Sequence, residues 1–450
     1  MERVFPVDIK TITFEEITWV NQYVRNLAPY IYVREADSLL IKIPNEAFKL
    51  NPIGIKLLKH LLAGNSVESI IYNFPGRKEE ITQDIHNFFC DLRAVLKGCY
   101  NEKELRRSVE KVEFTLPYNT LPVLSEIAVT YKCDIACKFC YASCGCKKDE
   151  TVKDLSTKDL KTVISRIKND AEVPSVSFTG GEPTLRKDLA SLIKHAKAEK
   201  MWVNLITNGT LITPERAKEF KEAGLDSSQV SIEAGKASLH DEITQSAGSF
   251  EKTIKGIKNL IGAGIRCHTN TTISRLNKEN LFEILSLVKS LGLSKLSMNM
   301  LMPAGSAVVN LKETSISYGE IGEIVLAVKK EAERLGLEFM WYSPTPICIF
   351  NPIVHGLGNK GCSACDGLLS LAPNGDILPC SSYPKPMGNI LEKDFKSMWF
   401  GADFKYFQEK KFAHEKCQRC GSIAVCNGAC PLYWEKFGYN ELEKTHACIN

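Results

Sequence analysis

Short apolar runs alternate with amphipathic segments over the middle of the chain, from about residue 121 to residue 335. The apolar runs are of strand length and predict strands over 123–131, 175–179, 202–206, 229–233, 266–273 and 295–301. The segments between and after them have helical periodicity and predict helices over 156–169, 187–200, 213–223, 250–263, 278–291 and 317–335. Strands that alternate with helices favour a parallel sheet, because parallel neighbours need crossover connections. We therefore predict an α/β fold.

Six strand–helix units are too few to close an eight-stranded barrel. The pattern predicts a partial (β/α)6 barrel over residues 121–310, and an open doubly wound sheet is the alternative. In either architecture, ligands bind at the carboxyl ends of the strands. Residues that follow the predicted strands are therefore the first candidates for a functional site.

The N-terminal part of the chain has a different pattern. Residues 30–43 read as two strands around a polar turn, and three amphipathic stretches follow at 53–63, 66–74 and 78–97. A hairpin followed by such helices can form a compact unit of its own. We expect a separate domain over residues 1–107.

Beyond about residue 340, regular periodicity fades and cysteine becomes frequent. Nine of the 17 cysteines lie from Cys348 onward. A segment with so little periodicity and so many thiols is expected to depend on metal for its fold. We predict a bridging helical segment over 311–347 and a metal-dependent domain over 348–450.

The composition and the first residues indicate the cellular compartment and disfavour two classes of binding partner. The net charge of +4, from 57 basic and 53 acidic residues, is too balanced to favour nucleic acid or an anionic membrane as the main partner. The first residues, MERVFPVD, lack the basic and apolar regions of a signal peptide, and no apolar run approaches the ~18 residues that span a bilayer. We expect a cytoplasmic protein, in which 17 cysteines indicate metal ligation rather than disulfides.

Three cysteines follow the first strand of the predicted barrel. Cys133, Cys137 and Cys140 have the spacing C-x3-C-x2-C. Three thiolates can hold three corners of a cubane iron–sulfur cluster and leave its fourth iron open, unlike four-cysteine clusters that mainly transfer electrons. A zinc knuckle is the alternative, and the rival triad Cys137, Cys140 and Cys144 shares two of these thiols. We favour the first triad because Cys133 lies at the strand end and Phe139 places an aromatic ring beside the last ligand.

A glycine-rich turn follows the second predicted strand. In Thr179-Gly180-Gly181-Glu182-Pro183, paired glycines allow a ligand to approach the backbone closely, and proline fixes the turn. Alone, this is a weak signal, because many tight turns look similar. One strand away from the cysteine triad and at the same end of the sheet, it becomes a strong one.

C-x3-C-x-aromatic-C followed by Gly-Gly-Glu-Pro on a strand–helix repeat resembles the radical S-adenosylmethionine (radical SAM) superfamily, over residues 121–310. The resemblance implies that Cys133, Cys137 and Cys140 bind a [4Fe–4S] cluster whose open iron is chelated by SAM. It also implies reductive cleavage of SAM to a 5′-deoxyadenosyl radical that abstracts a hydrogen from the substrate. The residues implied to contact SAM are Phe139, Gly180, Gly181, Glu182, Pro183, Thr207, Asn208, Ser231 and Arg275.

The fourth strand departs from the family pattern, and Arg275 has an alternative interpretation. Relatives commonly read Ser-Leu/Ile-Asp-Gly at the fourth strand, whereas this chain reads Ser231-Ile232-Glu233-Ala234-Gly235. No role is therefore carried over to Glu233. For Arg275 the alternative is a solvated charge at the start of a helix.

A third motif lies in the C-terminal region. Gly375-x4-Cys380 is followed by C-x2-C-x5-C-x3-C from Cys417 to Cys430, and then by Cys448. This resembles the SPASM extension of radical SAM enzymes, which carries two auxiliary [4Fe–4S] clusters; a pair of four-cysteine zinc ribbons is the alternative. The resemblance assigns Cys362, Cys365, Cys380 and Cys430 to the first auxiliary cluster, and Cys417, Cys420, Cys426 and Cys448 to the second.

The remaining thiols are less informative. Cys348 is a rival of Cys362 for the fourth position in the first auxiliary cluster; if neither binds, that cluster has an open iron. The others, which read as small buried hydrophobes or surface thiols, are Cys90, Cys99, Cys144, Cys146 and Cys267. A redox or substrate-handling role is the alternative for Cys144 and Cys146.

The N-terminal order of hairpin and three helices resembles the winged-helix leader-recognition element of peptide-modifying enzymes, akin to the pyrroloquinoline quinone biosynthesis chaperone (PqqD-like). There, the leader of a precursor peptide adds as an extra strand to the sheet edge. A DNA-binding winged helix is the alternative, but the charge balance and the lack of a basic recognition helix disfavour it.

Together these resemblances predict a radical SAM/SPASM oxidoreductase, similar to sactisynthases and pyrroloquinoline quinone maturases. It would carry three [4Fe–4S] clusters, bind SAM, take electrons from a flavodoxin or ferredoxin, and install a thioether or carbon–carbon cross-link in a ribosomal precursor peptide. One alternative is the maturation of a protein subunit or of a small molecule such as a tetrapyrrole. Another, from a different class, is a zinc-binding winged-helix regulator.

Overall fold

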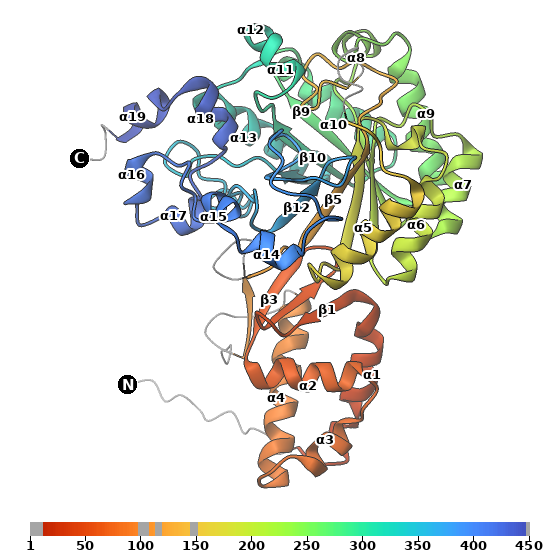
Figure 1. The fold of residues 1–450 in the computed structure, drawn as a ribbon, viewed down its shortest axis with the longest axis vertical. Coiled ribbons are helices and arrows are strands. Elements are labelled where there is room, and N and C mark those ends of the chain that lie inside the picture. The colour runs from red at the N-terminus through yellow and green to blue at the C-terminus, as the bar shows by residue number, and fades with distance from the viewer. Residues whose placement is uncertain (1–11, 98–107, 113–118, 145–151, 447–450) are drawn as a thin grey trace. The chain divides into compact units, whose positions relative to one another are not determined.

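The computed structural model describes residues 12–97, 108–112, 119–144 and 152–446. These residues form two compact units, one up to Thr120 and the other from Leu121 onward (Figure 1). Cys99, Cys146 and Cys448 lie outside the described residues. No helix in the described ranges is long and apolar enough to cross a bilayer.

The first unit combines an antiparallel sheet with four α-helices. Its elements are α1 (Trp19–Leu27), β1 (Ile31–Arg34), β2 (Leu39–Lys42), β3 (Glu46–Leu50), α2 (Pro52–Leu62), α3 (Val67–Asn73), α4 (Lys78–Lys97) and β4 (Val109–Val112). The strands pair in the order β1-β2-β3-β4. The predicted hairpin and the three helices that follow it are confirmed, whereas α1, β3 and β4 were not predicted.

Local side-chain contacts define several of these elements. Asn51 caps α2 by accepting a hydrogen bond from the Gly54 amide at 2.7 Å, and Ser66 caps α3 in the same way. In the turn between β1 and β2, the buried Arg34 and Asp37 side chains form an ion pair at 2.8 Å. The Asp37 carboxylate also accepts from the Thr120 amide at 2.9 Å, which ties the end of the unit back to its first hairpin.

The second unit is built on a sheet whose strands follow one another in space as they do in sequence. These strands are β5 (Leu124–Thr130), β6 (Ser175–Gly180), β7 (Trp202–Thr207), β8 (Ser227–Ser231), β9 (Arg266–Ile273), β10 (Lys295–Met300) and β11 (Glu338–Trp341). All neighbouring pairs from β5 to β11 are parallel. The six predicted strands are confirmed, and β11 comes from the segment 311–347, which was predicted to be helical.

Helices connect these strands along the chain and lie on one side of the sheet or at the ends of its strands (Figure 1). They are α5 (Thr157–Asn169), α6 (Leu189–Ala198), α7 (Pro214–Ala223), α8 (Ala237–Thr244), α9 (Ser249–Gly262), α10 (Leu281–Ser290), α11 (Ser306–Val309), α12 (Leu311–Thr314) and α13 (Tyr318–Leu335). Because the strand order never reverses, right-handed crossovers all lead to the same face, as in a barrel and unlike a doubly wound sheet. β11 and β13 form the two edges of the described sheet, so the predicted partial barrel is confirmed.

The two faces of the barrel strands carry different side chains. Buried apolar residues such as Phe178, Leu205 and Val230 belong to the core that the strands share with the helices. The alternate positions, such as Thr179 and Gln229, line a cavity on the other face. The period of two along each strand thus separates the core from the candidate site.

The C-terminal region extends the same sheet. β12 (Leu368–Leu371) pairs parallel with β5, and β13 (Ile377–Leu378) pairs antiparallel with β12. Gly375, with a φ of +87°, lies between these two strands and explains the G-x4-C spacing as a hairpin that leads into Cys380. Short helices follow: α14 (Phe395–Trp399), α15 (Ala402–Gln408), α16 (Glu415–Gln418), α17 (Ile423–Cys426), α18 (Pro431–Phe437) and α19 (Asn440–His446).

Candidate active site

The loop that follows β5 is held in place by the barrel around it. The amides of Ala136 and Lys138 donate to the last carbonyls of α8, those of Thr244 and Ile243, at 3.0 and 2.9 Å. The carbonyl of Cys140 accepts from the Ser306 amide at 2.8 Å, at the start of α11. The cysteine loop is therefore fixed on both sides by backbone hydrogen bonds.

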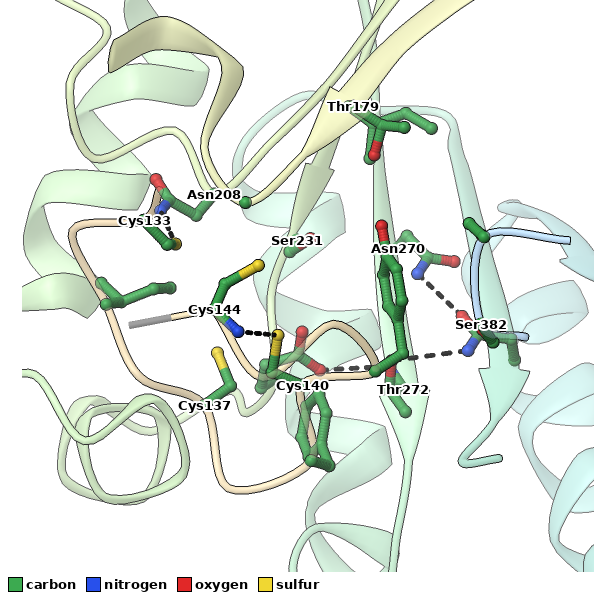
Figure 2. A pocket seen from close by; sticks show the side chains of 18 of the residues that line it. Cys133, Cys137, Cys140, Cys144, Thr179, Asn208, Ser231, Asn270, Thr272 and Ser382 are labelled. Carbon is green, nitrogen blue, oxygen red and sulfur yellow. Dashed lines mark hydrogen bonds between the residues drawn. The ribbon is translucent and has the colours of Figure 1, made fainter. Parts of the chain in front are cut away.

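This loop closes one side of a cavity of about 330 Å³. Strands β5 to β10 and the residues that follow them provide most of the remaining wall, as Figure 2 shows from close by. Of the residues predicted to bind the cluster or SAM, those that line the cavity are Cys133, Cys137, Phe139, Cys140, Gly180, Gly181, Thr207, Asn208 and Ser231. The structure thus brings together residues that are spread over about a hundred positions of the sequence.

The cysteine sulfurs face a common space in Figure 2. Burial raises the pKa of Cys133 to about 12 and that of Cys137 well above its ordinary value. The hydrogen bond with the Cys144 thiol lowers the pKa of Cys140 to about 7. Buried thiolates are costly unless a cation compensates them, so this set of soft donors fits a bound metal cluster.

Cys144 is a fourth thiol in the cavity wall. Its amide donates to the Cys140 sulfur at 3.3 Å, and the side chain is buried. The structure therefore brings both the favoured triad and the rival triad to the same cavity. Among the described residues, no three His, Cys, Asp or Glu side chains converge as the ligands of a single metal ion would. A cubane cluster differs from a single ion because each of its ligands binds a different iron atom.

The paired glycines serve the packing of the turn on the cysteine loop. A Cβ at Gly181 would lie 2.2 Å from the carbonyl oxygen of Lys132, and one at Gly180 would lie 2.2 Å from that of Thr130. The Gly181 and Glu182 amides donate to these same two carbonyls at 2.8 Å. Glycine is thus required at both positions because the turn packs closely against the end of β5. Both glycines are also exposed to the cavity.

Glu182 and Pro183 do not line the cavity. The fully buried Glu182 carboxylate lies behind the wall, where it accepts from Thr207 Oγ1 and from the Asn208 amide, both at 2.8 Å. Pro183 begins a short 3₁₀ helix and is also buried. The role of Glu182 and Pro183 as SAM contacts therefore stays a prediction. The Glu182 carboxylate positions Asn208, whose side-chain amide reaches Asp134 at 2.8 Å and the Cys133 sulfur at 3.9 Å.

Arg275 is also placed away from the cavity. Its side chain is 51% exposed, and its guanidinium lies 3.9 Å from the Glu320 carboxylate. This placement is compatible with the alternative, a solvated charge near a helix start, and the contact of Arg275 with SAM stays a prediction. Lys278 approaches the same carboxylate at 3.9 Å.

Glu233, to which no role was carried over, does line the cavity. Its buried carboxylate accepts from the Thr272 amide at 3.0 Å, and burial raises its pKa to about 8. Its own amide donates to Nδ1 of His240 at 3.2 Å, and burial lowers the pKa of that histidine to about 4. The longer carboxylate at the fourth strand is thus accommodated inside the site.

Several cavity residues were missed by sequence reasoning. They are the polar residues Glu126, Gln229, Asn270, Thr272, Asn299, Ser381 and Ser382. A signal existed for some of them, because buried parallel strands are usually continuously apolar. Polar residues at every second position, as at Gln229 and Ser231 or Asn270 and Thr272, mark the face that lines the cavity.

The auxiliary cysteines lie in the region after β11. Cys365 donates its amide to the Pro379 carbonyl at 3.1 Å, which brings it beside Cys380. The buried ammonium of Lys410 donates to the Cys362 carbonyl at 3.0 Å and pairs with the Asp366 carboxylate at 2.8 Å. Ser381 and Ser382 connect this region to the cavity, since they directly follow Cys380 and line the wall.

Comparison with known families agrees with these sites. Residues 127–289 match the radical SAM superfamily, and residues 362–421 match the SPASM iron–sulfur cluster-binding domain. Both resemblances inferred from the motifs are confirmed. The chain carries a radical SAM domain, which implies SAM and a [4Fe–4S] cluster, and a SPASM domain, which binds further iron–sulfur clusters.

Two curated relatives cover similar parts of the chain. An AdoMet-dependent heme synthase from Oleidesulfovibrio alaskensis is 27% identical over 325 residues, 67% of this chain and 80% of the relative. A PqqA peptide cyclase from Bradyrhizobium diazoefficiens is 26% identical over 334 residues, 72% of this chain and 84% of the relative. Among solved structures, Streptococcus suis SuiB bound to its precursor peptide SuiA has a TM-score of 0.64 at 18% identity, over 90% of this chain and 95% of SuiB. At that identity, the likeness shows the fold alone.

Proposed function

We propose that this enzyme, which joins a radical SAM domain to a SPASM domain, installs a thioether or carbon–carbon cross-link in a ribosomally made precursor peptide. The observation that carries the proposal is the cavity, which combines cysteine thiols with an uncharged polar and acidic wall. The peptide-modifying relatives support the same class of substrate. A flavodoxin or ferredoxin would supply the electrons.

Cys133, Cys137 and Cys140 would hold the [4Fe–4S] cluster. Phe139 and the Gly180–Gly181 turn would hold SAM, together with Thr207, Asn208 and Ser231. When bound, this pair of cofactors supplies a 5′-deoxyadenosyl radical that abstracts a hydrogen atom from the substrate. The chain contributes the rigid wall that orients the substrate carbon and excludes water, because every strand of the wall is fixed by parallel pairing to its neighbours.

The charge of the wall favours a peptide over a tetrapyrrole. Among the described residues that line the cavity there is no lysine or arginine, whereas Glu126 and Glu233 bring two carboxyl groups. A tetrapyrrole precursor carries several carboxylates, and these described wall residues offer them no cationic partner. The amides of Gln229, Asn270 and Asn299 instead match the neutral donors and acceptors of a peptide backbone.

The first unit would capture the leader of the precursor. Among the described residues, β1 and β4 are the two edge strands of its sheet. A leader could add to β1, where Tyr30 immediately precedes the strand and is 58% exposed. Ile53, 65% exposed at the start of α2, offers a second apolar contact, because α2 packs beside β1.

The test is anaerobic incubation of the iron-loaded chain with SAM, a strong reductant and a synthetic cysteine-containing precursor peptide, followed by mass spectrometry. A peptide lighter by two hydrogens per modification is expected. Alkylation of free thiols then separates a thioether, which consumes a cysteine, from a carbon–carbon bond. Unchanged peptide mass with deuterium uptake from solvent would contradict cross-linking and indicate epimerisation.

A second candidate is favoured by the relatives named heme synthase. In that case a carboxylate-bearing tetrapyrrole, and not the peptide, would stimulate release of 5′-deoxyadenosine. Replacing Glu126 by glutamine separates the two candidates. Removing negative charge from the wall should strengthen binding of a tetrapyrrole, whereas it has no such effect on a neutral peptide.

A further inference from the structure

The first barrel strand contributes a carboxylate to the wall of the cavity. Glu126 lies in β5 and lines the cavity, whereas no lysine or arginine of the described residues does so. A carboxylate that is held partly out of water without a nearby cation costs free energy. Such a departure from the rules of a stable core is typical of a functional site.

A serine of the neighbouring strand fixes the orientation of this carboxylate. Ser370 in β12 lies directly opposite Glu126 in the parallel ladder, and its buried hydroxyl donates to Oε1 of Glu126 at 2.6 Å. Backbone pairing already joins β12 to β5, so the sheet does not depend on this contact. Oε2 of Glu126 has no hydrogen-bond partner in the described part of the chain, and it is therefore free to accept from a molecule in the cavity.

The strand that contacts Glu126 leads into the auxiliary cysteines. β12 and β13 form a hairpin that is followed by Cys380, a predicted ligand of the first auxiliary cluster, and Ser382 lines the cavity two residues further on. Figure 2 shows Ser382 across the cavity from Cys133 and Cys137. Glu126 thus lies where the barrel wall meets the region that is predicted to hold the first auxiliary cluster.

The second carboxyl group of the wall has different surroundings. Glu233 is only 4% exposed, and its carboxylate accepts from the Thr272 amide at 3.0 Å. It follows the predicted SAM contact Ser231 by two residues, and its amide donates to His240 in α8, the helix whose last carbonyls hold the cysteine loop. Glu233 therefore lies on the cofactor side of the cavity, and Glu126 is the more open of the two carboxyl groups.

Formation of a cross-link requires a proton acceptor in this cavity. After hydrogen abstraction, the carbon radical of the peptide bonds to a sulfur or carbon atom that still carries its own hydrogen. The new bond replaces the bond to that hydrogen, so one proton and one electron leave the peptide. An oxidised auxiliary [4Fe–4S] cluster takes up the electron, whereas the proton needs a base within hydrogen-bond distance.

We propose that Glu126 is the catalytic base of the cross-linking step and that Ser370 positions its carboxylate. Oε2 of Glu126 accepts the proton from the attacked sulfur or carbon as the new bond forms. The neutral acid then returns the proton to solvent after the product leaves. The inference deepens the proposed function and rests on it, because it assigns the proton that the same cross-linking reaction releases.

Product counting in the full iron-loaded chain tests the inference. Parent and Glu126→Gln enzymes are incubated in D2O without oxygen with SAM, a strong reductant and a synthetic cysteine-containing precursor peptide. Mass spectrometry then gives the amount of cross-linked peptide per 5′-deoxyadenosine formed. Glutamine keeps an acceptor for Ser370 but cannot take up a proton, so this ratio should fall by at least about 100-fold. The remaining peptide should carry deuterium, because the excess reductant and a solvent deuteron quench the carbon radical.

Further variants separate a catalytic base from a structural carboxylate. Glu126→Asp keeps a carboxylate and should recover part of the ratio, Ser370→Ala should lower it less than Glu126→Gln does, and the exposed Glu222→Gln should equal the parent. A parent-like ratio in Glu126→Gln, or an equal or larger fall in Glu233→Gln, would overturn the inference and leave the proposed function intact. Loss of 5′-deoxyadenosine itself in Glu126→Gln would also overturn it, because the residue would then act before the cross-linking step. A parent enzyme that forms no cross-link would overturn both.

Discussion

Replacing Glu182 by glutamine removes one hydrogen-bond acceptor from the buried junction behind the cavity. Oε1 of Glu182 accepts from the Thr184 amide at 2.9 Å and from the Thr207 hydroxyl at 2.8 Å, and Oε2 accepts from the Asn208 amide at 2.8 Å. Both carboxylate oxygens thus face a backbone N–H. Whichever way the glutamine amide is turned, its NH2 group faces one of these donors.

The cost follows from that geometry. One hydrogen bond to a charged acceptor is lost and one backbone N–H is left buried without it, which costs about 1.5–3 kcal/mol. The fold tolerates this loss, but the turn that carries Asn208 opens more often, by roughly 10- to 150-fold. Because Asn208 lines the cavity, affinity for SAM should fall within the same range.

Hydrogen–deuterium exchange of the peptide spanning Asn208 measures the opening, and equilibrium dialysis of radiolabelled SAM measures the affinity. The control is Glu222→Gln, because the Glu222 side chain is 67% exposed and its only ion pair in the described part of the chain is at 3.9 Å. That change should stay within about 0.5 kcal/mol of the parent. Parent-like exchange and affinity in Glu182→Gln would refute the positioning role of Glu182.

Other parts of the chain give independent predictions. Gly181→Ala forces a methyl group against the Lys132 carbonyl and should lower the free energy of unfolding in urea by about 1–3 kcal/mol; Gly262→Ala, with nothing within 4 Å, should leave it unchanged or slightly raised. Burial holds the folded-state pKa of His240 at about 4, so from pH 6.5 to 4 protons bind preferentially to the unfolded chain and stability falls by up to about 3 kcal/mol. His240→Gln should flatten the pH dependence over that window, and an unchanged slope would contradict the assignment. Asp37→Ala leaves the buried guanidinium of the first hairpin without this carboxylate and should cost about 3–5 kcal/mol, measured as faster proteolysis of the first unit.

Periodicity predicted the barrel well because its strands and helices are long and each has one consistently buried face. The elements that were missed are short. The strands β4 and β11, with four residues each, are defined by their pairing with β3 and β10 rather than by their own pattern. β3 follows Pro44 and was not predicted, since its pairing with two antiparallel neighbours makes it a strand.

The motifs located the cysteine loop and the glycine turn but not the direction of each side chain. Glu182 faces the interior because buried donors on two other segments surround it, which no local sequence pattern encodes. Arg275 is half exposed and lies 3.9 Å from the Glu320 carboxylate, a position that its place after the fifth strand does not encode. The Ile347 amide donates to the Cys426 sulfur at 3.4 Å, a contact between residues 79 positions apart that spacing alone does not encode.

The most direct measurement compares the release of 5′-deoxyadenosine from SAM by anaerobic, reduced enzyme in three single-alanine variants. If Cys133, Cys137 and Cys140 hold the cluster, Cys133→Ala abolishes release, whereas Cys144→Ala still supports it and the exposed Cys90→Ala equals the parent. Release that survives loss of Cys133 but disappears with loss of Cys144 would assign the cluster to the rival triad. Release that survives both substitutions would contradict the account that an open iron in this cavity binds SAM.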